Sequence, residues 1–212
     1  MKKSSLFIAI ILACMIMLPA GAFALPISGS GAWGSFTGSL EYRYEASNSA
    51  YLTISLTNTS PAANGGYLVA FAFNNPGNNI VSIDLEATNT NFSAALDNNS
   101  INAQPYGLFD ILASTSGSFE GGGRPQYGIA AGESAVFAFY LLGYNLNTLN
   151  DLSFVNELST TGAAFFVARF SGFENGTSDK VPAGGASVPE PGTMLLLGLG
   201  LLGLGITTKR KP

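Results

Sequence analysis

The side chains that could support catalysis in this sequence are carboxylates. A pair of them can hydrolyse a glycosidic bond, one acting as the acid and the other as the base or nucleophile. The candidates in the middle of the chain are Asp84, Glu86, Asp97, Asp110, Glu120 and Glu133. Nothing in their spacing identifies a pair, and the local alternation of apolar and polar residues sends Asp84 and Glu86 to the solvent side of a strand.

Composition excludes a Ser-His-Asp or Cys-His catalytic site and removes the commonest zinc ligands. The chain has no histidine, and its single cysteine, Cys14, lies close to the N-terminus. The glycine run 121–123 lacks the Gly-Lys-Ser/Thr ending of a phosphate-binding loop, so we interpret it as a flexible surface loop. We therefore expect a protein that is not an enzyme, with no catalytic residue and no cofactor.

The segment 169–182 contains several charged side chains close together. Glu174, Asp179 and the carbonyl of Asn175 offer the hard oxygen ligands that calcium prefers, but their spacing matches no recognised calcium loop. The alternative is structural: Arg169, Glu174, Asp179 and Lys180 would form an ion-pair cluster that closes the last loop onto the domain. We favour the structural interpretation and expect no metal site.

Three aromatic residues could stack against a sugar ring. Trp33, Tyr106 and Tyr127 lie in segments flanked by glycine or proline rather than in apolar runs, which favours exposure of their rings. The alternative for Trp33 is packing at the edge of the core, because tryptophan has a large apolar surface to bury. The three residues are the candidate sugar-stacking site.

Charge limits the partners of the body of the chain. Between Leu25 and Val188 there are four basic and twelve acidic residues, a net charge of −8. An acidic surface repels phosphate, so we expect neither nucleic acid nor anionic lipid headgroups as partners. This body contains no cysteine, so its stability depends on packing and hydrogen bonding rather than on disulfides.

Alternation with a period of two predicts strands. Between residues 52 and 57 the apolar Leu52, Ile54 and Leu56 alternate with polar residues. The same pattern over 80–87 predicts Val81, Ile83 and Leu85 inward with Ser82, Asp84 and Glu86 outward. Further strand candidates are 38–45 (with Leu40, Tyr42 and Tyr44 on one face), 68–73, 109–113, 135–142 and 165–170.

Seven or more short strands separated by Gly, Asn, Ser and Pro clusters predict an all-β fold, an antiparallel β-sandwich of jelly-roll or Ig-like type. We expect one domain over residues 25–183, with its aromatic residues filling the space between two sheets. One short helix is predicted over 150–158, with Leu152, Val155 and Leu158 at helical spacing.

The N-terminus has the three parts of a secretory signal peptide. Lys2 and Lys3 precede an apolar stretch over 6–18, and Ala22-Phe23-Ala24 is a small-x-small cleavage site. We expect signal peptidase to remove residues 1–24 and leave Leu25 at the start. The alternatives are an uncleaved anchor helix, for which the stretch is short, and a lipoprotein signal at Cys14, which fits the flanking residues poorly.

The C-terminus also has three parts. Pro189-Glu190-Pro191 follows a linker over 184–188, the uncharged apolar run 193–208 comes next, and Lys209-Arg210-Lys211 closes the chain. As a helix, the 16 residues of the run would span about 24 Å, short of the roughly 30 Å hydrocarbon core. An ordinary single-pass anchor remains the alternative to a removable signal. The basic cluster should stay cytoplasmic and leave the body outside the inner membrane.

This tail, residues 189–212, resembles the sorting signal of PEP-CTERM proteins, which are substrates of exosortase. The resemblance implies a Gram-negative-type bacterium, transient insertion of 193–208 into the inner membrane, cleavage near Pro189-Glu190-Pro191, and delivery to the cell surface or an exopolysaccharide matrix. The body is also similar to sandwich-like bodies that precede this tail, and no active site is carried over from them.

The expected function is therefore that of an exported surface or extracellular-matrix protein with a structural or adhesive role in exopolysaccharide and biofilm. Its expected partners are signal peptidase and exosortase during processing, and exopolysaccharide afterwards. The alternative is a carbohydrate-binding module for exopolysaccharide, and a third reading is a glycoside hydrolase that uses a carboxylate pair.

Overall fold

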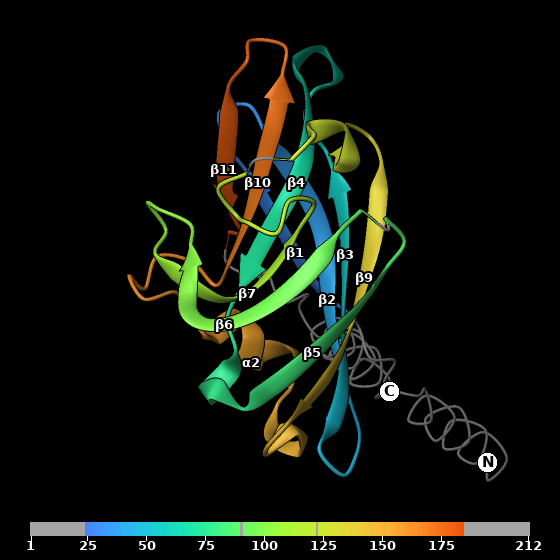
Figure 1. The fold of residues 1–212 in the computed structure, drawn as a ribbon, viewed down its shortest axis with the longest axis vertical. Helices are drawn as coiled ribbons and strands as arrows, with labels where there is room; N and C mark the ends of the chain where they lie inside the picture. Colours follow the sequence, from blue (N-terminus) through green and yellow to red (C-terminus); the bar gives the residue numbers. More distant parts are fainter. Residues whose placement is uncertain (1–23, 90, 122, 185–212) are drawn as a thin grey trace, which may run out of the picture.

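The structure is a computed structural model that describes residues 24–89, 91–121 and 123–184. These residues form two antiparallel sheets packed face to face, with one short helix at one end (Figure 1). The elements are β1 (Leu25–Ser30), β2 (Ser35–Ala46), β3 (Ser49–Asn58), β4 (Gly65–Phe73), β5 (Ile80–Ala87), β6 (Ser93–Asn102), β7 (Leu108–Ser114), β8 (Ile129–Ala130), β9 (Ser134–Gly143), α2 (Asp151–Asn156), β10 (Phe166–Phe173) and β11 (Ser178–Pro182).

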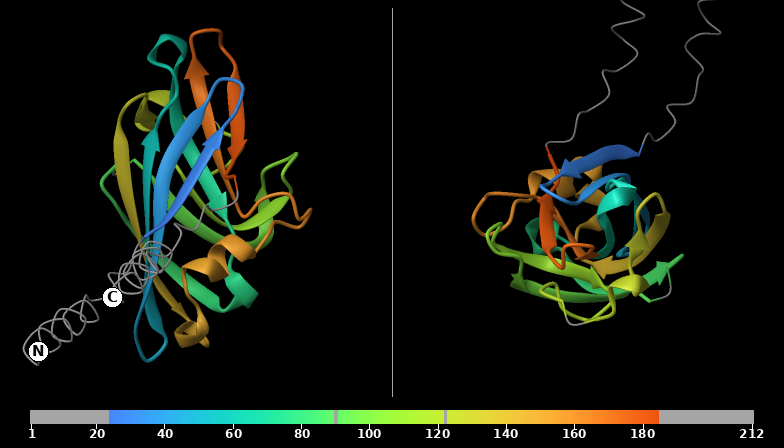
Figure 2. Two further views of the ribbon diagram at one scale, coloured as in Figure 1. Left: turned by 180° about the vertical axis from the view of Figure 1, so that it is seen from behind. Right: turned by 90° about the horizontal axis from the view of Figure 1, so that it is seen from above.

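The first sheet has the strand order β1-β2-β3-β9-β5, and the second has the order β11-β10-β4-β7-β6 with β8 beside β4. Every pairing among these strands is antiparallel. The two sheets face each other across the core when the molecule is seen from above (Figure 2). The all-β, antiparallel prediction is confirmed. The predicted signal peptide and sorting segment lie outside the described residues.

Within the described ranges, no helix is long and apolar enough to cross a membrane.

Aromatic rings from both sheets interlock in the core. Phe71 on β4 lies 4.7 Å from Phe137 on β9 and 5.5 Å from Phe166 on β10, measured between ring centroids. The first contact is between the sheets and edge-to-face, the arrangement that aromatic quadrupoles favour. Leu52, Ile54 and Leu56 are fully buried beneath them, as their alternation predicts. The expectation that aromatic residues fill the space between two sheets is confirmed.

Two side chains predicted to point inward are exposed instead. Val81 is 54% exposed because the register of β5 against β9 shifts between Ile80 and Ser82, which removes Val81 from the alternating pattern. Ile83 and Leu85 recover the pattern and pack against the core. Tyr44 is exposed because it lies where the pairing of β2 with β3 becomes irregular, next to the hairpin tip.

The predicted helix exists, but it buries a different face. Asn150 caps α2: its side chain accepts a hydrogen bond from the Ser153 backbone N–H, and the Ser153 hydroxyl accepts one from Asn150 N–H, both at 3.1 Å. Phe154 is buried, with its ring 5.5 Å from that of Tyr42. Leu152 and Leu158 are exposed, and Leu158 lies beyond the last helical residue.

Candidate functional site

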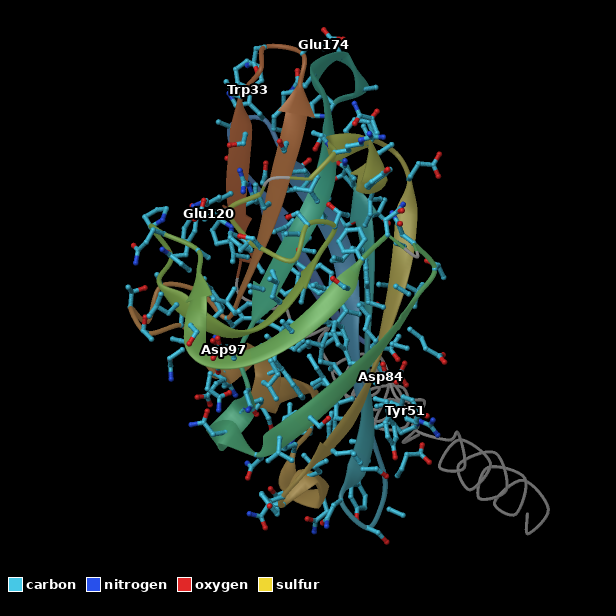
Figure 3. All side chains as sticks on the ribbon, viewed as in Figure 1. Trp33, Tyr51, Asp84, Asp97, Glu120 and Glu174 are labelled. Atoms are coloured by element: carbon cyan, nitrogen blue, oxygen red, sulfur yellow. The ribbon has the colours of Figure 1, made fainter. Side chains whose placement is uncertain are left out.

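The carboxylates considered for hydrolysis are distributed over different elements. Asp110 on β7 is buried and accepts hydrogen bonds from the backbone N–H groups of Asn75 at 2.8 Å and Asn99 at 2.7 Å, which fixes it as a structural group. Glu120 forms an ion pair with Lys180. Asp84 lies on the outer face of the first sheet, away from Asp97 and Glu120 (Figure 3). Glu86, two residues from Asp84 on β5, is also exposed, and Glu133 is exposed just before β9.

The proposed cluster in 169–182 does not form as predicted. Residues 178–182 form β11 and pair with β10, so Asp179 and Lys180 point to opposite faces of the second sheet. Asp179 accepts hydrogen bonds from two backbone N–H groups of the β1–β2 turn, and Lys180 pairs with Glu120 instead. Glu174 is exposed at the tip of the β10–β11 hairpin (Figure 3). The interpretation as one ion-pair cluster is therefore wrong.

The side chains predicted as calcium ligands are also kept apart, because Asp179 lies on β11 and Glu174 lies at the tip of the β10–β11 hairpin. In the described part of the chain, no group of three or more His, Cys, Asp or Glu side chains lies close enough to hold a metal ion. The side chain of Asn175 accepts hydrogen bonds from the backbone and hydroxyl of Thr177, within its own turn.

The three predicted sugar-stacking residues lie on three separate loops. Trp33 is 41% exposed in the β1–β2 turn, where its ring lies 6.4 Å from that of Phe173. Tyr127 is equally exposed, and the guanidinium of Arg124 lies 5.9 Å from its ring. Tyr106 is half-buried in the β6–β7 connection. The structure does not bring these rings together into one platform.

A different set of side chains lies in one row across the outer face of the first sheet. Arg43 on β2 is the register partner of Tyr51 on β3, Tyr51 is the partner of Tyr140 on β9, and Tyr140 is the partner of Asp84 on β5. We call these four residues the tyrosine row. At a strand spacing of about 4.8 Å, four neighbouring strands spread the row over about 14 Å.

Three members of the tyrosine row, Arg43, Tyr51 and Tyr140, are in contact through their side chains. The rings of Tyr51 and Tyr140 are 5.2 Å apart between centroids, with an angle of 52° between their planes. The guanidinium carbon of Arg43 lies 5.5 Å from the centre of the Tyr51 ring, and Arg43 also forms an ion pair with Glu45 at 2.7 Å. Figure 3 shows Tyr51 and Asp84 at the same level of the sheet.

Alternation in the strands places the row on the surface. Leu52 and Phe139, register partners on β3 and β9, are fully buried, so Tyr51 and Tyr140 next to them must point outward. The row presents two rings between a cation at one end and a carboxylate at the other. Rings can pack against the apolar face of a sugar, and the charged ends can hydrogen bond to its hydroxyl groups.

Sequence reasoning missed the tyrosine row because it sought aromatic residues outside the apolar runs. Tyr140 lies inside the run 135–142, in which both faces of the strand carry large apolar side chains. The available signal was the pair Phe137 and Phe139. Because these two residues share the buried face of the strand, Tyr140 must lie on the opposite face. Knowing that β3 and β9 are neighbours would also have been necessary.

Comparison with known proteins identifies the C-terminal tail. Residues 187–211, which include Pro189, Glu190 and Pro191, match the family model described as the PEP-CTERM protein-sorting motif. The resemblance of the tail is therefore confirmed, and it supports export and membrane-associated sorting to the cell surface by exosortase. Among the other predicted processing residues, Leu25 is the first residue of β1, Ala24 precedes it, and Ala22 lies outside the described residues.

No curated protein matches the chain. One similar solved structure, described as the unique CBM3- of Hungateiclostridium clariflavum, is 14% identical, with a TM-score of 0.30 over 66% of this chain and 93% of that one.

Proposed function

We propose that this chain is an exported, non-catalytic surface or matrix protein that adheres to exopolysaccharide through the tyrosine row. The sorting motif at 187–211 supports the destination. The observation that carries the adhesive role is the row Arg43, Tyr51, Tyr140 and Asp84 on four neighbouring strands of one sheet, with Tyr51 half-buried and the other three exposed.

The position of the row favours binding to an extended polymer. β3 and β9 are central strands of the first sheet, bonded to neighbours on both sides, so the two tyrosines are held on a rigid support. A rigid site loses little conformational freedom on binding. A site on an open sheet face allows a long chain to extend beyond it at both ends.

Processing completes the proposed function. Removal of residues 1–24 by signal peptidase and cleavage near Pro189-Glu190-Pro191 by exosortase would release an acidic body from the inner membrane into the exopolysaccharide or biofilm matrix. Mass spectrometry of the protein from the cell surface should find Leu25 at the start and no peptide from 195–204. An intact tail on the surface protein would contradict release and leave a membrane anchor.

The adhesive role is tested by affinity electrophoresis in gels that contain the exopolysaccharide of the host. We expect wild type to be retarded, Tyr51→Ala and Tyr140→Ala to lose most of the retardation, and the double variant to migrate as in a plain gel. The matched control is Tyr144→Ala, which removes a tyrosine that is 65% exposed outside the row. Equal retardation of the wild type and the double variant would contradict the proposal.

The absence of catalysis is tested with the same polymer. The environments of Asp110 and Glu120, each engaged by other groups of the protein, support a structural role for these carboxylates. We expect no release of reducing ends above the buffer control. Release that disappears in Asp84→Asn or Glu86→Gln would instead establish a hydrolase on the outer face of the first sheet.

A further inference from the structure

Three of the four basic residues of the body belong to the outer face of the second sheet or to the loop that crosses it. Arg169 on β10 and Lys180 on β11 are register partners and share its outer face. Arg124 belongs to the loop between β7 and β8, which crosses in front of β4 and β10 (Figure 1).

A small cavity lies between that loop and β10. Its volume is about 50 Å³, and its polar lining comes from Thr115, Ser116, Arg169 and Ser171. Since one water needs roughly 10–15 Å³ of such space, the cavity has room for about three to five water-sized groups. Three heavy atoms are the content of a carboxylate, whereas a whole sugar ring would not fit.

Arg169 is a half-buried cation without a carboxylate partner. Its Nη1 donates a hydrogen bond to the backbone oxygen of Phe119 at 2.8 Å, and its enclosed Nε has no acceptor in the described part of the chain. The ion pairs among the described residues are those of Arg43 with Glu45 and Lys180 with Glu120. Glu120 therefore neutralises Lys180 and leaves the guanidinium of Arg169 available.

Burial lowers the pKa of Arg169 from its ordinary value, and the charge of Glu120 acts in the opposite direction. An arginine remains protonated in proteins even after such a shift. A half-buried charge without a counter-ion is unfavourable, and the planar guanidinium matches the geometry of a carboxylate.

Glycine keeps the space around this guanidinium open. A Cβ on Gly121 would lie 2.6 Å from Nη1 of Arg169, and the φ of Gly121 is +100°, a conformation that other residues rarely adopt. Any larger residue at 121 would displace the side chain of Arg169. Gly121, interpreted from the sequence as part of a flexible loop, therefore has a positional role here.

We propose that the cavity at Arg169 binds the carboxylate of a uronic acid residue, so that the polymer preferred by this protein is an acidic polysaccharide. The identity of the ligand rests on the proposed function. The overall negative charge of the body does not prevent such binding, because charges farther than about 10 Å are largely screened at 0.1 M salt. The cavity lies on the second sheet, so a chain bound here does not compete with one on the tyrosine row.

The test compares polygalacturonate with the same polymer after full methyl esterification, which removes the charge and adds one methyl group to each carboxyl. A charge-assisted hydrogen bond should make wild type bind the acid form about tenfold more tightly in affinity electrophoresis. Arg169→Gln should reduce this ratio to about one. Tyr51→Ala, the control, removes an uncharged ring of the tyrosine row on the other sheet and should weaken both forms alike, leaving the ratio unchanged.

Two further measurements keep the proposal falsifiable. Ser171→Val fills part of the cavity without touching the guanidinium. This variant should also reduce the ratio of acid-form to ester-form binding to about one, and it replaces Arg169→Gln if that variant fails to fold. Free galacturonate, titrated by NMR, should shift the amides of Gly121 and Ser171 in wild type but not in Arg169→Gln, which separates the cavity from effects of a polymer. Absence of these shifts would overturn the site.

The outcomes also distinguish the two proposals. Equal binding of the acid and ester forms by wild type would overturn the carboxylate site and leave the adhesive function standing. If free galacturonate shifts the amides but neither polymer retards the protein, the result would support the cavity and contradict adhesion of the protein to these polymers. Persistence of the tenfold ratio in both cavity variants would place the acid recognition elsewhere and overturn the proposal.

Discussion

The carboxylate of Asp179 on β11 accepts a hydrogen bond from the backbone N–H of Trp33 at 2.8 Å, across 146 positions of the chain. The same oxygen, Oδ2, accepts a second bond from Gly34 at 3.0 Å. These bonds join the last described strand to the turn between β1 and β2. A side chain on Gly31 would lie 2.5 Å from that oxygen, so glycine is required for the turn to approach Asp179.

Removal of the Asp179 carboxylate should weaken this link between β11 and the β1–β2 turn. We expect Asp179→Ala to lower the free energy of unfolding by about 1–2 kcal/mol, because two charge-assisted hydrogen bonds are lost where water can partly replace them. Asp179→Asn keeps an oxygen acceptor and should cost about half as much. Urea denaturation measures both, with Glu86→Ala on the exposed face of β5 as the control, expected within about 0.5 kcal/mol of wild type. Equal stability of all four proteins would contradict the closing role.

Phe71 is the ring through which the two sheets are most tightly joined. Its ring contacts those of Phe137 and Phe139 on β9, and it is fully buried. We expect Phe71→Ala to lower the free energy of unfolding by about 3–5 kcal/mol, since the rigid rings around it cannot collapse into the space. Tyr144→Ala, at an exposed position, should change it by less than about 0.5 kcal/mol. A loss below about 1 kcal/mol for Phe71→Ala would show that the core relaxes.

The strands were predictable where one face of the sheet is buried and the other is polar. Leu52, Ile54 and Leu56 alternate with Ser and Thr, and the structure buries all three. Val81 was predicted wrongly because a bulge depends on the pairing of β5 with β9, and one sequence contains no record of which strands are neighbours. The sequence did not predict β6. Polar residues at its outward positions and Asn residues that are typical of turns obscure the alternation of apolar and polar residues.

The candidate sites were less predictable than the strands because they depend on contacts between distant segments. The partners of Asp179 are backbone N–H groups, so the residue types of the β1–β2 turn do not identify the carboxylate that they bind. The tyrosine row requires Arg43, Tyr51, Tyr140 and Asp84 to fall into register on four strands. The tail was predictable because it is read as a linear motif, without any folding of the chain.

Close approach of β2 and β3 requires a glycine at position 38. An ideal Cβ on Gly38 would lie 2.1 Å from the backbone oxygen of Ser55, which cannot move without disturbing the pairing of the strands. We expect Gly38→Ala to lower the free energy of unfolding by about 1–3 kcal/mol through overpacking. The control is Ser39→Ala, the next residue of the strand, which should be within about 0.5 kcal/mol of wild type. Thermal denaturation compares the two, and equal midpoints would mean that β2 shifts at little cost.

Tyr42 should make the stability of the protein sensitive to alkaline pH. Its hydroxyl donates a hydrogen bond to the backbone oxygen of Leu146 at 2.7 Å, on the strand that also carries Arg43 of the tyrosine row. Burial, together with the charge of Tyr44, raises the pKa of Tyr42 from 10.0 to about 12. The folded state therefore favours the neutral phenol, and this contribution is fully present below pH 10 and lost as the pH rises toward 12.

Tyr42→Phe separates the hydrogen bond from the titration. At pH 8 the variant should be less stable by about 1 kcal/mol, because the oxygen of Leu146 loses its donor. Between pH 10 and 12 its urea midpoint should fall less steeply than that of wild type, since the group whose ionisation opposes folding is gone. Tyr144→Phe, at an exposed position, should give a curve parallel to that of wild type. Parallel curves for wild type and Tyr42→Phe would show that another group causes the alkaline loss of stability.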